Sequence, residues 1–240
     1  MDKSPETTEP DSASRGSFHA RTGGAGGGSL RRWALTAGAI LLLAILISTG
    51  VRLFLVDLYT VSQESMDPTV ADGERVLVDK RYPGDAGVQP GDVVVFDGEG
   101  SFVPYRGGPS LQETLEQVGH WFGVGSPPEV FVKRVIGTEG DLVTCCDDQG
   151  RLRLNGEPLA EPYLAEPPTP EQPASSLQFE AEVPAGRMWV MGDNREDSVD
   201  SRSLLGAPGG GMISQDRIIG RATDVVWPWT HRRSLEGDRP

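Results

Sequence analysis

An uncharged run of 19 residues, from Trp33 to Val51, constrains this chain more than any other feature of its sequence. A helix needs roughly 20 apolar residues to cross a bilayer, and L-F-L-V continues the apolar character after Arg52. A cleaved secretion signal has a shorter apolar stretch of roughly 7–15 residues and a short basic start, whereas this run follows a long leader. We therefore expect residues 33–56 to form an uncleaved transmembrane anchor.

The segments on either side of the anchor differ in composition. Residues 1–32 are rich in Ser, Thr, Gly and charge, which is typical of a disordered tail. Arg31 and Arg32 flank the anchor on this side, and basic flanks stay in the cytoplasm. We therefore expect the N-terminus in the cytoplasm, residues 57–231 as an extracytoplasmic domain, and residues 232–240 as a C-terminal tail.

The outer part of the chain is predicted to be mainly β. Its many glycines and prolines, 31 and 19 in the whole chain, indicate frequent turns and few long helices. Short apolar runs between turn residues predict strands at Arg75–Val78, Val93–Phe96, Phe131–Ile136, Arg151–Leu154, Arg187–Met191 and Ile218–Trp227. Strands at this spacing favour an antiparallel sheet or a partly closed barrel.

Two insertions interrupt the predicted strands. Residues 99–129 contain a capping box at Ser110–Glu113 and apolar positions at helical spacing, which predict a helix over residues 110–122. This helix either packs on the core or lies in the membrane interface, where tryptophan is common. Residues 144–186 are interpreted as a smaller β subdomain with a proline-rich loop at Glu166–Ser176.

Composition excludes several classes of function. The formal charge of -13 would repel a nucleic acid. Only three histidines occur, and His19 and His231 lie in polar or charged ends, which leaves His120 as the one candidate in the folded body. A histidine-based serine hydrolase is thus disfavoured, a zinc site is nearly excluded, and we expect no metal and no cofactor.

The only cysteines, Cys145 and Cys146, are adjacent, which is not metal-finger spacing. Neighbouring cysteines rarely pair with each other, because bridge geometry normally needs Cα atoms that are farther apart. Two free thiols in a strand are our main interpretation. A vicinal disulfide on an oxidising side of a membrane is the alternative.

The segment Q-E-S-M-D-P-T places Ser65 shortly after the anchor, on a stretch that Pro68 stiffens. A serine hydroxyl needs a nearby base, and burial can lower the pKa of a lysine enough for that role. Lys133, in F-V-K-R-V-I, shares one strand face with Phe131 and Val135. Its neighbour Arg134 faces the other side together with apolar residues, so the pattern leaves open which face is buried. A surface lysine is the alternative interpretation.

Four segments in this order, behind a membrane anchor, carry a family resemblance: Q-E-S-M-D-P-T, G-D-V-V-V-F, F-V-K-R-V-I-G-T-E-G-D and M-G-D-N-R-E-D-S-V-D-S-R. The chain between Asp57 and Trp227 resembles bacterial type I signal peptidase. The resemblance implies a Ser/Lys endopeptidase that removes signal peptides from exported proteins, with Ser65 as the nucleophile and Lys133 as the general base.

The resemblance also implies supporting residues. Ser198 would orient the lysine, and Asp200 and Arg202 would support the site. Asp193, Asn194 and Arg195, in G-D-N-R, would also support it, although Asp and Asn occur in ordinary turns as well. The backbone N–H of Ser65 would bind the oxyanion. Many members add a hydroxyl two residues earlier, where this chain has Gln63, and Ser62 is the neighbouring candidate for a second donor.

The expected partners are secretory preproteins with small residues at the cleavage site, and the lipid bilayer. The edge segment L-Y-T-V-S-Q, just before Ser65, could pair with an extended peptide. We expect a monomer and no nucleic acid. Self-cleaving repressors use a related dyad, but they carry a DNA-binding module in place of an anchor. The remaining alternative is an inactive, membrane-tethered β domain that binds or scaffolds.

Overall fold

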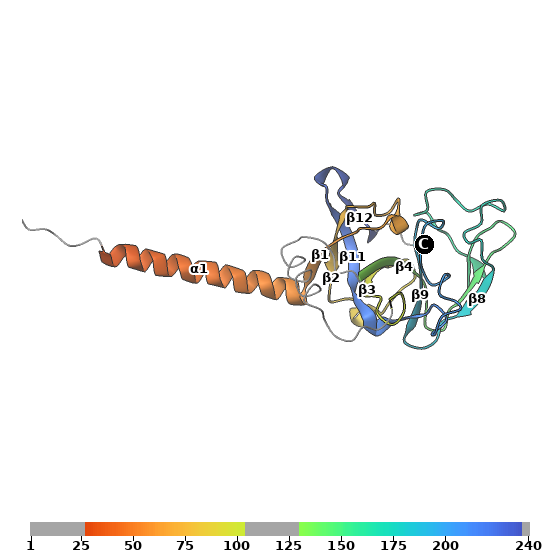
Figure 1. The fold of residues 1–240 in the computed structure, drawn as a ribbon, viewed down its shortest axis with the longest axis horizontal. Coiled ribbons are helices and arrows are strands. Elements are labelled where there is room, and N and C mark those ends of the chain that lie inside the picture. Colours follow the sequence, from red (N-terminus) through yellow and green to blue (C-terminus); the bar gives the residue numbers. More distant parts are fainter. Residues whose placement is uncertain (1–26, 104–129, 237–240) are drawn as a thin grey trace, which may run out of the picture. The chain divides into compact units, whose positions relative to one another are not determined.

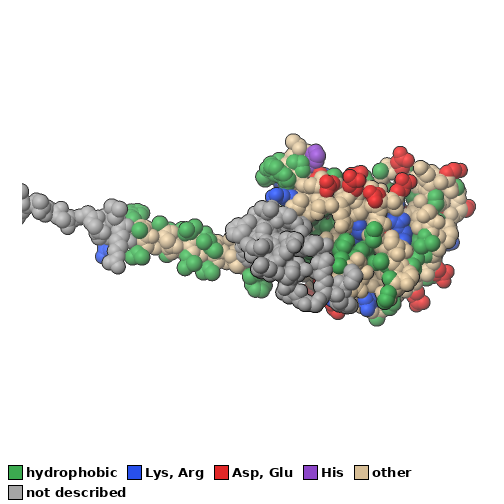
Figure 2. All heavy atoms as spheres, in the orientation of Figure 1, with side chains coloured by type: hydrophobic (Ala, Val, Ile, Leu, Met, Phe, Trp, Pro, Cys, Tyr) green, Lys and Arg blue, Asp and Glu red, His purple; other side chains and the backbone are tan. Residues whose placement is uncertain are grey.

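The computed structural model describes residues 27–103 and 130–236, and the chain divides into two units, Met1–Ile47 and Ser48–Pro240. Helix α1 (Gly27–Phe54) begins earlier than the predicted anchor and ends two residues before it. Its segment Arg32–Phe54 is long and apolar enough to cross a membrane, with a mean hydropathy of 2.3. Large hydrophobic side chains from Trp33 to Phe54 are exposed along it (Figure 2). A helix with this surface fits the predicted membrane span.

The larger sheet has eight strands in the order β1-β2-β11-β3-β4-β9-β10, with β12 paired to β11, and every pair is antiparallel (Figure 1). The strands are β1 (Val56–Thr60), β2 (Arg75–Asp79), β3 (Val93–Asp97), β4 (Val130–Thr138), β9 (Arg187–Met191), β10 (Ile213–Ser214), β11 (Ile218–Trp227) and β12 (Arg233–Ser234). Short 3₁₀ helices are η1 (Glu64–Met66), η2 (Gly84–Ala86), η3 (Gln215–Arg217) and η4 (Trp229–His231).

The register of this sheet is interrupted at several places. Shifts occur in β11 between Ala222 and Asp224, and in β4 between Val135 and Gly137. Bulges of this kind bend a strand and increase its twist, so the sheet curls into a partly closed barrel. The predicted antiparallel β architecture is confirmed.

A second sheet has four strands in the order β7-β6-β5-β8, namely β5 (Leu142–Cys145), β6 (Arg153–Leu154), β7 (Glu157–Pro158) and β8 (Phe179–Glu182). Asn155 and Gly156 both have positive φ, as the tight hairpin between β6 and β7 requires. Phe179 stacks on Trp189 of β9 with ring centroids 5.1 Å apart, and this contact joins the two sheets. The smaller β insertion is therefore present, whereas the helix predicted over residues 110–122 lies outside the described residues.

The folded part continues past residue 231, into the segment 232–240 that the sequence predicts to be a tail. Arg233 and Ser234 form β12, Arg233 pairs with Glu74 at 2.6 Å, and Leu235 is buried in the core. The charged sequence at this end concealed the strand, because its stability comes from β11 and Glu74, which are far away in the chain.

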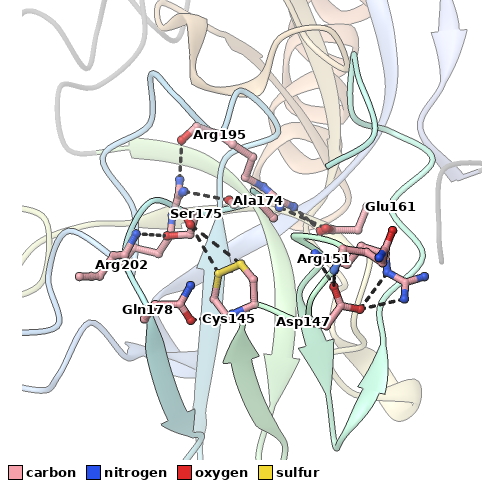
Figure 3. The surroundings of a disulfide bond; sticks show 12 residues. Cys145, Asp147, Arg151, Glu161, Ala174, Ser175, Gln178, Arg195 and Arg202 are labelled. Atoms are coloured by element: carbon pink, nitrogen blue, oxygen red, sulfur yellow. Dashed lines mark hydrogen bonds and ion pairs between the residues drawn. A yellow bond between two sulfur atoms is a disulfide. The ribbon is translucent and has the colours of Figure 1, made fainter. Parts of the chain in front are cut away.

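Cys145 and Cys146 form a vicinal disulfide at the end of β5 (Figure 3). Our main interpretation of two free thiols was therefore wrong, and the alternative holds. Both sulfur atoms lie near the carbonyl oxygen of Ser175, at 3.6 and 3.9 Å, and Cys145 is buried. Ser175 and Ala174 are buried as well, so the end of the proline-rich loop packs against the small sheet rather than extending into solvent.

Candidate active site

Ser65 lies on η1, in the connection between β1 and β2, and only 6% of its surface is exposed. The adjacent Met66 is completely buried in the core of the larger sheet, and the Val70 N–H donates to the Met66 carbonyl at 2.8 Å. Burial of Met66 fixes the short segment on the sheet, and this holds the Ser65 hydroxyl in place.

Lys133 lies in the middle of β4, and its Nζ donates a hydrogen bond to Ser65 Oγ at 2.5 Å. Only 1% of its surface is exposed. Every residue from Val132 to Gly137 is buried, so both faces of this strand are covered. This answers the question that periodicity left open: Lys133 is inside, and so is Arg134 on the opposite face.

Burial lowers the pKa of Lys133 to about 8, from an ordinary value of 10.5. The negative charge of Asp200 acts in the opposite direction, and the positive charge of Arg202 lowers the pKa further. No carboxylate lies within ion-pair distance of the Lys133 ammonium among the described residues. The amine therefore has the environment that a lysine base needs.

Asp200 and Arg202 form a tight pair beside this amine. Asp200 is completely buried and accepts two hydrogen bonds from the Arg202 guanidinium, at 2.9 and 2.7 Å. Burial alone would raise the pKa of Asp200, but the hydrogen bonds and charge of Arg202 outweigh it, and the pKa is lowered. Asp200 Oδ2 also accepts the Gly192 N–H at 3.0 Å, which ties the pair to the loop that follows β9.

That loop contains G-D-N-R, and it directly contacts the segment that carries Ser65. The Asn194 N–H donates to the Ser65 carbonyl at 3.1 Å, and Asn194 Nδ2 donates to the Glu64 carbonyl at 3.2 Å. A Cβ atom at Gly192 would clash with the Ser65 carbonyl and with Ser198 Oγ, so only glycine fits here. Asp193 pairs with Arg134 at 2.7 Å, with both side chains fully buried.

The structure leaves two of the sequence-derived roles untested. Ser198 Oγ lies beside Gly192 and is buried, but in the described part of the chain no hydrogen bond joins it to Lys133 Nζ. Gln63 and Ser62 are both exposed, and Gln63 has extended backbone dihedrals of φ -147° and ψ 143°. The orienting role of Ser198 and the oxyanion role of Gln63 or Ser62 stay predictions.

Sequence reasoning did not identify three buried side chains near this site as functional. Arg134 lies over the ring of Tyr163, with its guanidinium carbon 3.8 Å from the ring centroid, and Glu161 pairs with Arg195. The position of Arg134 beside Lys133 in an apolar strand was an available signal. Glu161 and Tyr163 had none, because the arginines that they contact, Arg195 and Arg134, lie more than twenty residues away in the sequence.

Within residues 27–103 and 130–236, no group of three or more His, Cys, Asp or Glu side chains could hold a metal ion.

Comparison with known proteins places the chain among peptidases. Residues 30–227 match the family described as signal peptidase, peptidase S26. The chain is 36% identical over 201 residues to a probable signal peptidase I from Mycobacterium leprae, covering 71% of this chain and 68% of that protein. It is 34% identical over 203 residues to signal peptidase I T from Bacillus subtilis, covering 83% and 88%. A crystal structure of a signal peptidase I from Enterococcus faecalis is 25% identical, covers 57% of this chain and 97% of its own, and has a TM-score of 0.37.

Proposed function

Because this chain belongs to the peptidase S26 family of signal peptidases, we propose that Ser65 and Lys133 form the dyad with which it cleaves signal peptides from exported preproteins. The observation that carries this proposal is the 2.5 Å contact between Lys133 Nζ and Ser65 Oγ, two buried polar groups 68 residues apart in the sequence. Burial of a charged amine is unfavourable, so an unpaired lysine held against a serine fits a base better than a purely structural role.

The depressed pKa makes the chemistry accessible near neutral pH. With a pKa of about 8, half of the lysine is uncharged at pH 8, whereas an ordinary lysine is well under about 1% uncharged there. Uncharged Lys133 takes the Ser65 proton as Ser65 Oγ attacks the scissile carbonyl. The Lys133 ammonium so formed protonates the amine of the departing mature protein, and the signal peptide remains bound to Ser65 as an acyl-enzyme. Uncharged Lys133 then activates a water molecule, which releases the signal peptide.

The tetrahedral intermediate needs hydrogen-bond donors for its oxyanion, and one such donor is worth about 3–4 kcal/mol. We propose the backbone N–H of Ser65 as the first donor. Gln63 or Ser62 would supply the second. Both side chains are exposed, and they come immediately before η1 in the chain. Either side chain can therefore turn toward a bound carbonyl without first leaving the core.

The position of β1 supports substrate binding at the edge of the sheet. This strand is at the end of the sheet order, with β2 as its one partner strand among the described residues. An extended peptide can pair with such an edge, and its scissile bond would then lie near Ser65. We propose that preproteins bind here, with small side chains before the cleavage point.

We further propose that α1 anchors the enzyme in the cell membrane, with its N-terminus in the cytoplasm and Ser65 on the outer side. The apolar span Arg32–Phe54 supports an anchor, and Arg31 and Arg32 at its N-terminal flank support this orientation.

The decisive experiment is cleavage of a secretory precursor by the full-length enzyme in detergent or liposomes. We expect Ser65→Ala and Lys133→Ala to abolish cleavage, and also Lys133→Arg, because arginine stays charged and cannot accept the proton. Two matched controls should retain activity. Ser176→Ala changes a serine in the proline-rich loop, and Lys80→Arg changes a lysine that donates to the Arg52 carbonyl. Wild-type turnover in any of the three dyad variants would remove that residue from the mechanism, and an inactive wild type would favour a tethered scaffold.

A further inference from the structure

Two buried side chains in the smaller β insertion, Glu161 and Tyr163, contact Arg195 and Arg134. Glu161 and Tyr163 lie between β7 and β8, in the smaller β subdomain. The sequence assigns no role in the reaction to any residue of this subdomain. The Glu161 side chain is 1% exposed, and Tyr163 is 5% exposed. A buried carboxylate requires partners, and the identity of those partners indicates what it does.

Glu161 is paired with the arginine of G-D-N-R (Figure 3). Arg195 donates through Nη1 to Glu161 Oε2 at 3.2 Å and through Nη2 to Oε1. The third nitrogen of the same guanidinium, Nε, donates a hydrogen bond to the Gly192 carbonyl at 3.1 Å. The fork geometry of arginine thus fixes the distance between the insertion and the loop after β9.

Tyr163 holds the second arginine. Its hydroxyl donates to Glu161 Oε1 at 2.8 Å, and its ring supports the guanidinium of Arg134 at 3.8 Å. Arg134 in turn makes a bidentate pair with Asp193, at 2.9 and 2.7 Å. Glu161 and Tyr163 therefore form one connected unit, which we call the insertion clamp.

The insertion clamp and the nucleophile contact the same loop. Gly192 and Asp193 are held by Arg195 and Arg134, while the next residue, Asn194, bonds to the carbonyls of Glu64 and Ser65. A shift of this loop moves the backbone of Ser65 relative to Lys133, which is on a separate strand. Displacement of a reacting group by about 1 Å can lower a rate by about 100-fold.

We propose that Glu161 and Tyr163 are positioning residues for the reaction: acting through Arg195 and Arg134, they set the place of the Gly192–Asn194 loop and hence the distance from Ser65 Oγ to Lys133 Nζ. This inference rests on the proposed function. Neither residue contacts the dyad itself, so both act at one remove from the chemistry.

The test is steady-state cleavage of a secretory precursor by full-length Glu161→Gln, which keeps the shape of the side chain but removes its charge. We expect kcat to fall about 10- to 100-fold, with KM within about twofold of wild type, because β1 and the substrate edge are unchanged. Glu157→Gln, at an exposed glutamate on β7 of the same insertion, is the matched control and should keep kcat.

Two further variants separate positioning from general stability. Tyr163→Phe keeps the ring over Arg134 and loses only the hydrogen bond to Glu161, so we expect a smaller fall in kcat, about 3- to 10-fold. In Glu161→Gln/Arg195→Gln, kcat should fall no further than in the more impaired single variant, because the two residues act through one contact.

The proposal is overturned if folded Glu161→Gln, matched to wild type in its circular dichroism, has wild-type kcat, since a lower denaturation midpoint alone would indicate a structural role. If Glu161→Gln does not fold, Tyr163→Phe decides, and an unchanged kcat in that variant has the same consequence. Ser65→Ala is measured in parallel. Full cleavage by Ser65→Ala contradicts the proposed function. If Ser65→Ala is inactive but Glu161→Gln and Tyr163→Phe keep the wild-type kcat, only this inference is contradicted.

Discussion

Replacing Lys133 with methionine should abolish cleavage. The difference in free energy of unfolding between the variant and wild type should also depend on pH, and it should favour the variant more at neutral pH than at alkaline pH. A lysine whose pKa falls from 10.5 to about 8 on folding destabilises the folded state by about 3 kcal/mol when both states are protonated. Methionine has a similar length and no charge, so this penalty disappears in the variant.

The pH window follows from the sign of that change in pKa. Below about pH 8 both states bind the proton and the penalty is complete. Between about pH 8 and 10.5 only the unfolded state keeps its proton, so the free energy of unfolding of the wild type rises with pH. From pH 7 to pH 10 the wild type should gain about 2.5 kcal/mol that the variant does not gain.

The assay is urea unfolding of the full-length protein in detergent, followed by tryptophan fluorescence at both pH values. The variant also loses the partner of Ser65 Oγ, which costs about 1–3 kcal/mol, but that loss is the same at both pH values and cancels in the comparison. Ser65→Ala is the control: it loses the same contact, retains the buried lysine, and should keep the wild-type pH dependence. A difference between Lys133→Met and wild type that does not change with pH would refute the reasoning.

Two other outcomes follow from the structure. In wild type, kcat/KM should rise about tenfold per pH unit and level off above about pH 8, as Lys133 loses its proton; a flat profile between pH 6 and 9 would mean that another group is the base. Reduction of the Cys145–Cys146 disulfide by a dithiol should lower the free energy of unfolding by only about 1 kcal/mol, because a bridge between adjacent residues removes little entropy from the unfolded chain; a loss above about 3 kcal/mol by urea titration would contradict this.

The strands were predictable because their signals are local. Turn residues such as Asn155-Gly156, and apolar runs such as Val93–Phe96, recur at strand spacing, and the structure places strands at or beside each predicted run. The long apolar helix α1 was predictable for the same reason, since its length and lack of charge can be counted directly. The strand at Arg233–Ser234 was missed, because its pairing with β11 and the contact of Arg233 with Glu74 are distant in sequence.

The candidate site was only partly accessible to the same reasoning. Ser65 and Lys133 could be named from the chemistry that each residue requires and from the family resemblance. Periodicity could not decide whether Lys133 is buried, because both faces of its strand carry apolar residues. The insertion clamp had no local signal, because the contacts that bury Glu161 and Tyr163 are made with Arg195 and Arg134, which are distant in sequence.

The sequence by itself determined the long apolar helix, the strand periods, the turns and the residue types available for catalysis, since each of these depends on neighbours a few positions away. Only the tertiary structure decided that Ser65 meets Lys133 and that the insertion contacts Arg195 and Arg134. The reason is the order of the sheet: β11, from the C-terminal part of the chain, lies between β2 and β3. Long-range pairings of this kind depend on the whole core, which no local pattern encodes.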